Sequence, residues 1–172
     1  QESLDYFLSI NQVWGITMSY RAMAMAASGL GQHSQARQYI HQCLTVETEH
    51  LLIRHTLSTL FALAKIWVAQ GKVESAVGIL SMITQSALQT VFKRENQLLE
   101  ELKTQLPANR FNIAYDRGTQ CNFDQSVKEL IAELGKAASI SVGLTELTNP
   151  LTLRELEILR LVAKGLPNKN IA

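Results

Sequence analysis

Apolar residues recur at helical spacing along most of this chain. Over residues 53–70 they stand at i, i+3, i+4 and i+7 positions for three turns, and residues 73–85 repeat the pattern. The two stripes consist of Leu57, Leu60, Phe61, Ala64, Trp67 and Val68, followed by Val73, Ala76, Val77, Leu80 and Ile83. Apolar and polar residues seldom alternate as they do in a half-buried strand. The pattern therefore predicts an all-α protein.

The same pair of helices is predicted twice. Residues 13–30 and 33–46 carry the pattern of residues 53–70 and 73–85, 40 residues earlier in the chain. The matching positions are Ala24 with Ala64, Gly31 with Gly71, Ala36 with Ala76, and Ile40 with Leu80. Each glycine follows a first helix, where a left-handed residue is needed. The alanines let two antiparallel helices cross closely. Residues 4–10 are predicted to be the tail of an earlier helix.

This repeat resembles the tetratricopeptide repeat, a solenoid of right-handed antiparallel helix pairs. Ala24, Gly31, Ala36 and Ile40 occupy that family's characteristic small and large sites. The spacing of 40 residues exceeds the family's period of about 34. A third copy is absent in this register, since Phe111 stands where a glycine is expected.

Three further helices are predicted beyond the repeats. The first spans residues 86–105 and carries Glu95 on its apolar face, and Pro107 ends it. The second spans residues 108–117 and stops at Gly118, and a capping box of Asn122 with Gln125 opens the third, residues 123–134. We expect these helices to cap the end of the solenoid, so that repeats and cap occupy residues 1–134. Residues 135–149 lack periodicity and are rich in Ser, Thr and Gly, which favours a linker over an ordered stretch packed on the cap.

Residues 150–172 carry the pattern of a helix, a turn and the first residues of another helix. Thr152 and Glu155 form a capping box that starts a helix at Leu153, and Gly165 stops it. Pro167 cannot continue that helix, so the residues after it begin a second one. Helix, glycine-containing turn and helix are the components of a helix-turn-helix.

The residue identities in this stretch are more specific than its periodicity. Leu151-Thr152, Arg154-Glu155, Glu157-Ile158-Leu159, Leu161, Gly165, Asn168-Lys169 and Ile171-Ala172 resemble the opening of the LuxR-type DNA-binding domain, L-T-x-R-E-x-E-V-L-x-L-x-A-x-G-x-S-N-K-E-I-A. The resemblance implies that residues 150–172 are its N-terminal part and that the recognition helix follows Ala172. It also implies that Asn168 and Lys169 contact DNA phosphates, with an ordinary helix start as the alternative. Pro167 and Asn170 replace the family's capping Ser and Glu.

Charge and composition exclude several classes of protein. Sixteen basic and fifteen acidic residues leave a net charge of +1, so no overall basic field favours nucleic acid or membrane surfaces. No apolar run reaches the about 18 residues of a membrane span, and no signal peptide precedes the repeats. A cytoplasmic protein without membrane contact is therefore predicted.

No arrangement of chemically active residues predicts catalysis. Cys43 and Cys121 lack ligand-spaced partners and are expected to be reduced thiols, with a disulfide as the alternative. The histidines, His33, His41, His50 and His55, are expected at surface or boundary positions and not in a metal site. No glycine-rich phosphate loop or nucleophile elbow occurs. We expect neither enzyme activity nor a cofactor. The methionines are expected to fill the core, with an adaptable partner groove as the alternative.

Two functions follow. The first is the regulatory, effector- or partner-sensing repeat region of a bacterial LuxR-type transcriptional activator. The resemblance implies that the repeats relay the state of an upstream ATPase or sensor domain to DNA bound by the complete helix-turn-helix. The second is a free-standing helical-repeat scaffold for protein–protein interaction. The sequence leaves the oligomeric state open.

Overall fold

The computed structural model describes residues 2–85 and 93–148, and the side chains of this part as far as residue 136. Within these ranges every regular element is a helix and none is a strand, so the predicted all-α class is confirmed. The helices are α1 (Glu2–Ser9), α2 (Val13–Gly29), α3 (His33–Glu49), α4 (Ile53–Ala69), α5 (Val73–Gln85), α6 (Lys93–Gln105), α7 (Ala108–Gln120) and α8 (Phe123–Thr148). The chain divides into two compact units, residues 1–138 and 139–172, and the contacts below all lie in the first.

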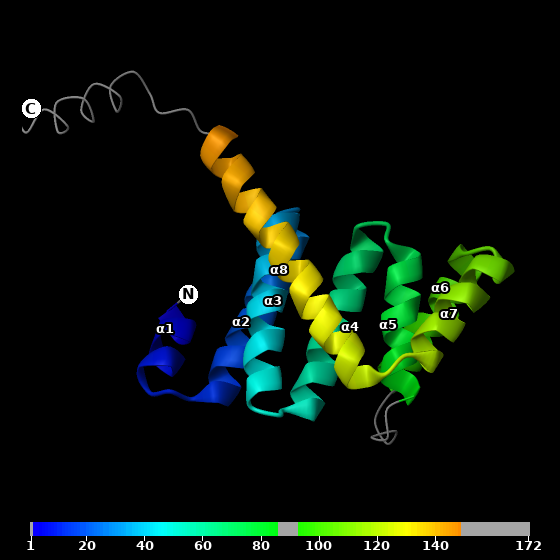
Figure 1. The fold of residues 1–172 in the computed structure, drawn as a ribbon, viewed down its shortest axis with the longest axis horizontal. Coiled ribbons are helices and arrows are strands. Elements are labelled where there is room, and N and C mark those ends of the chain that lie inside the picture. The colour runs from blue at the N-terminus through cyan, green and yellow to red at the C-terminus, as the bar shows by residue number, and fades with distance from the viewer. Residues whose placement is uncertain (1, 86–92, 149–172) are drawn as a thin grey trace, which may run out of the picture. The chain divides into compact units, whose positions relative to one another are not determined.

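From α1 to α6 each helix packs against the next one along the chain, whereas α7 packs on α5 (Figure 1). α2 packs on α3 and α4 packs on α5, as the repeated helix pairs predict. α2 and α4 also contact each other, which places the first helices of the two pairs side by side. The alanines expected at the close crossings, Ala24, Ala36, Ala64 and Ala76, have no exposed surface.

Four turns of the same construction connect α1 to α5. In each turn one residue has a positive φ, at Asn11 (49°), Gly31 (72°), Leu51 (54°) and Gly71 (74°), so successive turns lie twenty residues apart. The hydrogen bonds are those of a Schellman motif: after α2, the Gln32 amide donates to the Ala27 carbonyl at 2.9 Å and the Gly31 amide to the Ser28 carbonyl at 3.0 Å. The 40-residue repeat is therefore two 20-residue units of helix and turn.

Leu51 is the apolar exception among these turn residues. A left-handed conformation costs a residue with a Cβ about 1–2 kcal/mol, and the Leu51 side chain is 82% exposed, so little packing offsets that cost. Leu51→Gly is expected to raise the free energy of unfolding by roughly 1 kcal/mol, measured by urea denaturation.

Leu30 provides the matched control for Leu51, because it is 74% exposed and lies beside a turn but has a φ of −86°. Leu30→Gly is expected to leave stability unchanged or to lower it. Equal stabilisation by both substitutions would contradict the strain at Leu51.

The core follows the predicted stripes and extends beyond them. All the stripe residues of α4 and α5 are buried or packed against the core. α4 also buries Thr56, Thr59, Leu63 and Ile66 on its other faces, because α2, α3 and α5 all contact it. A helix enclosed in this way loses the one-sided pattern of a surface helix.

α7 continues past its predicted end at Gly118 to Gln120. Gly118 is buried, and a Cβ built on it meets the Gly78 carbonyl oxygen of α5 and the Ser81 hydroxyl. The glycine therefore permits a close approach of α7 to α5 and does not end the helix. Pro107 ends the preceding helix as predicted, since α6 stops at Gln105 and α7 begins at Ala108.

α8 begins where the capping box predicts and continues beyond the predicted end at Leu134, to Thr148. Asn122 Oδ1 accepts the Gln125 amide at 3.0 Å, whereas the Gln125 side chain turns to Glu129. The predicted end was wrong because Gly135 does not break this helix. The expectation that residues 135–149 lack helical structure is therefore corrected for residues 135–148, and a linker role for them stays a prediction.

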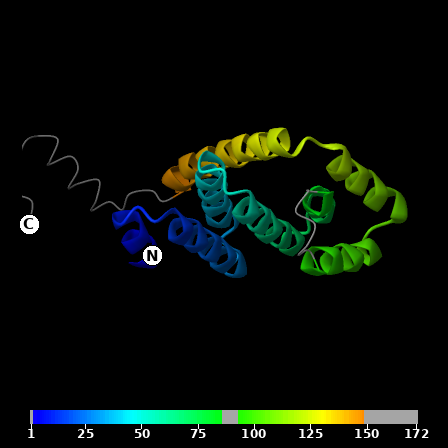
Figure 2. The same ribbon diagram turned by 90° about the horizontal axis from the view of Figure 1, so that it is seen from below.

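The part of α8 that belongs to the first unit, residues 123–138, runs across α3 and α4 (Figures 1 and 2). Its buried stripe of Val127, Leu130 and Leu134 joins the core, and Gly135 lies against His41 of α3. The start of α8 therefore lies against a helix of the repeats, and a capping role for α6, α7 and α8 stays a prediction. α6 and α7 both pack on α5 and lie where the predicted cap begins.

Some predictions fall outside the described residues. These are the first part of the predicted helix 86–105, at residues 86–92, and the whole helix-turn-helix segment 150–172 with Asn168 and Lys169. Among the helices that the structure describes, none is long and apolar enough to cross a membrane.

Candidate functional site

A cleft in the described part of the chain lies along α2 and α4. It has a volume of about 750 Å³ and is bordered at one side by the start of α6. We call it the α2–α4 cleft, and its lining residues are Met18, Arg21, Ala22, Met25, Arg54, Leu57, Ser58, Phe61, Ala62, Lys65, Arg94 and Glu95. Its volume falls within the range of about 300–1,000 Å³ that is typical of small-molecule sites.

The charges of the α2–α4 cleft are unbalanced. Among the described residues four cationic side chains line it, namely Arg21, Arg54, Lys65 and Arg94, against one carboxylate, that of Glu95. Arg54, Lys65 and Arg94 are exposed and remain solvated, whereas the Arg21 side chain is only 18% exposed. A site with net positive charge attracts anions in a chain whose overall charge is close to neutral.

Methionines form part of the apolar wall of this cleft. Met18 is 39% exposed, and Met25 also lines the cleft. The expectation that the methionines fill the core is therefore wrong for Met18, while Met82 is buried as expected. Flexible, polarisable thioethers suit a surface that adapts to a bound apolar group.

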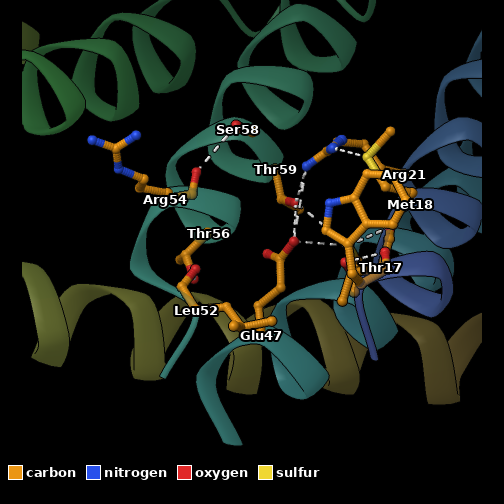
Figure 3. Close-up of polar contacts among 11 residues, drawn as sticks. Thr17, Met18, Arg21, Glu47, Leu52, Arg54, Thr56, Ser58 and Thr59 are labelled. Carbon is orange, nitrogen blue, oxygen red and sulfur yellow. Dashed lines mark hydrogen bonds and ion pairs between the residues drawn. The ribbon is translucent and has the colours of Figure 1, made fainter. Parts of the chain in front are cut away.

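Arg21 connects the cleft to a buried polar cluster (Figure 3). Its Nη1 lies 3.9 Å from Glu47 Oε1 and 3.5 Å from Thr59 Oγ1, while Nη2 contacts the Met18 sulfur. Arg54 points away from this cluster. The guanidinium of Arg21 therefore lies between a cleft that attracts anions and a carboxylate of the protein itself.

Glu47 is the centre of the buried cluster. Its side chain is fully buried in α3, and its Oε1 accepts hydrogen bonds from the Thr59 hydroxyl at 2.9 Å and the Cys43 thiol at 3.5 Å. Its Oε2 is buried with no hydrogen-bond partner among the described residues. Burial raises the pKa of Glu47 to about 7, against the opposing effects of Thr59, Cys43 and Arg21. The carboxyl group thus changes charge near neutral pH.

Comparisons with known protein families, curated proteins and solved structures give no match. The assignment of a site therefore depends on the geometry and charge of the chain itself. On those grounds the α2–α4 cleft, with Arg21 and Glu47 behind it, is the candidate functional site.

Two smaller cavities have a weaker preference for ligands of one charge. One of about 540 Å³ lies among α5, α7 and α8, and its charges nearly balance: Arg110 and Arg117 against Glu74, Glu129 and Glu133. Arg110 is already paired with Glu74. The other, of about 190 Å³, lies between the α3–α4 turn and α8. In both cavities acidic side chains exceed basic ones by one, a smaller imbalance than the excess of three cations in the α2–α4 cleft.

The cysteines are free thiols and the histidines occupy surface or boundary positions, as predicted from the sequence. Both cysteines are free thiols, and Cys43 is buried beside Glu47 while Cys121 is half-buried. Burial, followed by the nearby Glu47 carboxylate, raises the pKa of Cys43 to about 12, which keeps the thiol protonated and unreactive. The four histidines are exposed or half-buried. The described residues contain no group of three or more His, Cys, Asp or Glu side chains arranged to hold a metal.

Proposed function

We propose that this chain is the helical-repeat regulatory region of a bacterial LuxR-type transcriptional activator, followed by the start of its helix-turn-helix domain. The observation that carries the proposal is the run of family residues from Leu151 to Ala172. The paired helices and the repeated Schellman turns support a repeat architecture of the tetratricopeptide type upstream of that run.

The proposal assigns a task to each part of the chain. The repeats bind an effector or a protein partner and relay the state of an upstream ATPase or sensor domain. α8 leads from the repeats to residues 150–172, where Asn168 and Lys169 contact DNA phosphates and the helix after Ala172 enters the major groove. Such a protein acts in the cytoplasm, where it reaches DNA.

The alternative is a free-standing repeat scaffold for protein–protein interaction. The α2–α4 cleft suits either function, because an effector and a partner both need a selective concave surface. The parent gene separates them. A helix of the form S-x-x-T-V-K-x-H encoded directly after Ala172 supports the regulator. A different continuation contradicts the regulator and favours the scaffold.

DNA binding provides the functional test. The 172-residue chain is expected to bind duplex DNA only non-specifically, with a Kd of about 10⁻⁴–10⁻⁶ M at physiological salt, because the recognition helix lies after Ala172 in the family pattern. Fluorescence anisotropy with labelled duplexes of unrelated sequence measures this. A chain extended through the third helix is expected to select a binding site from a random library. Sequence-specific binding by the 172 residues alone would contradict the assignment.

A further inference from the structure

We propose that the α2–α4 cleft binds a small organic anion with an apolar body, and that the bound anion draws Arg21 away from Glu47, which then takes up a proton. This names the effector class and a proton linkage for the sensing role under "Proposed function". The role of the bound anion as an effector rests on the proposed sensing function, whereas the binding of the anion rests on the residues of the cleft alone.

The walls of the cleft specify the ligand. Four cations against one carboxylate favour an anionic head group. The apolar wall of Met18, Met25, Leu57 and Phe61 favours a carbon body, since apolar groups gain free energy when they leave water. Inorganic phosphate satisfies only the first of these requirements. The limited volume of about 750 Å³ favours a small molecule over an acidic protein segment several turns long.

Glu95 restricts the choice further. One of its carboxylate oxygens, Oε2, is buried without a hydrogen-bond partner among the described residues, on the side of the cleft formed by α6. A polyanion would be repelled there, whereas a single anionic group at the Arg21 side avoids the repulsion. The sequence had already marked Glu95 as a charged residue on an apolar face.

Arg21 is loosely held by its present partner. A distance of 3.9 Å between Nη1 and Glu47 Oε1 is an ion pair without a hydrogen bond. A bidentate contact with a carboxylate, sulfonate or phosphate head group is shorter and stronger. The anion and Glu47 therefore compete for the same guanidinium.

The sign of the proton linkage follows from the groups around Glu47. Arg21 faces it from α2, Cys43 from its own helix, the Thr59 hydroxyl from α4, and Asp124 and Lys128 of α8 line the small cavity that Glu47 also borders. A ligand anion adds negative charge and removes the compensation by Arg21. Both effects raise the pKa of Glu47, so binding takes up a proton and is tighter at lower pH.

The probe for the test is 8-anilinonaphthalene-1-sulfonate, a fluorescent apolar anion whose sulfonate stays ionised at all relevant pH values. Its Kd for the chain is expected to rise by roughly threefold to tenfold between about pH 6 and about pH 8.5, since a single linked proton changes affinity by at most tenfold per pH unit. Glu47→Gln is expected to bind with nearly the same Kd at both pH values. A pH dependence unchanged in Glu47→Gln overturns the linkage.

The cleft itself is tested with exposed residues, whose replacement leaves the core intact. Arg54→Gln combined with Lys65→Gln is expected to weaken dye binding at least fivefold, whereas Arg37→Gln, which replaces a half-buried cation outside the cleft, leaves it unchanged. Thermal unfolding confirms that each variant is folded. Equal binding by the cleft variant and the Arg37 control overturns the site.

Competition identifies the ligand class. Octanoate is expected to displace the dye, while octylammonium, which lacks the negative charge, and inorganic phosphate, which lacks the apolar body, do not. Displacement by an acidic peptide but not by octanoate overturns the small-molecule class in favour of a protein partner. The two proposals can fail separately. If octanoate binds but the parent gene lacks the recognition helix, the regulator assignment is wrong and the anion site remains.

Discussion

Glu47→Gln is expected to raise the free energy of unfolding by about 2–3 kcal/mol above neutral pH and to leave it nearly unchanged near pH 5. The carboxyl group is fully buried, and its pKa is about 7 in the folded chain against an ordinary value of 4.5. A glutamine keeps the oxygen that accepts from Thr59 and Cys43 while removing the buried charge.

The direction of the pH dependence follows from proton counting. Between pH 4.5 and about 7 the folded chain binds the Glu47 proton more tightly than the unfolded chain does. The stabilising contribution of the protonated group is therefore complete below pH 4.5 and is lost as the pH rises through about 7. The wild-type chain should lose stability relative to Glu47→Gln across this interval.

Urea denaturation at a series of pH values measures the difference between the two chains. Glu49→Gln is the matched control, because Glu49 lies on the same helix but is exposed. It should leave both the stability and its pH profile unchanged. A wild-type chain whose stability relative to Glu47→Gln rises with pH would show that Arg21 holds the carboxylate more strongly than burial disfavours it.

The helices were predictable from the sequence because their apolar stripes are long and their turns have local causes. Gly31 and Gly71 end helices through a positive φ, and Pro107 ends α6 because it lacks an amide donor. Leu51 makes the same turn without the residue type that identifies it. In the sequence, therefore, only the two glycine turns, 40 residues apart, were recognisable, and the twenty-residue spacing of the turns was not.

The candidate site was less predictable, because its residues come from different helices. Arg21, Arg54 and Arg94 are separated by tens of positions in the sequence, and only the packing of α2, α4 and α6 brings them to one cleft. One signal was present for the buried acid. Ile40, Cys43, Leu44 and Glu47 follow the i, i+3, i+4, i+7 spacing, so the apolar stripe of α3 leads directly to a carboxylate.

Gly118 shows how the meaning of a residue depends on contacts that the sequence does not contain. A glycine after a run of helical residues normally indicates a helix end, and the prediction of an end at Gly118 followed that rule. The structure places Gly118 inside α7 against the backbone of Gly78, where the absence of a side chain is what matters. The local pattern explains a glycine at this position by the end of a helix, whereas the tertiary packing explains it by the close contact between two helices.

Gly118→Ala is accordingly expected to lower the free energy of unfolding by roughly 2–3 kcal/mol, because overpacking of a well-packed contact outweighs the better helix propensity of alanine. The added methyl group meets the Gly78 carbonyl oxygen, which belongs to the backbone of α5 and cannot move aside as a side chain would. Accommodating it requires α7 to move away from α5, which also disturbs the buried Phe111 and Ala114 of α7.

Gly29→Ala provides the opposite control for the same substitution. Gly29 is the last residue of α2, and a Cβ built there meets no atom within 4 Å. Its replacement should leave stability unchanged or raise it by up to about 1 kcal/mol. Urea denaturation of the two variants separates propensity from packing. If Gly118→Ala were as stable as Gly29→Ala, α7 would not lie against α5 at this point, and the cavity among α5, α7 and α8 would have to be redrawn.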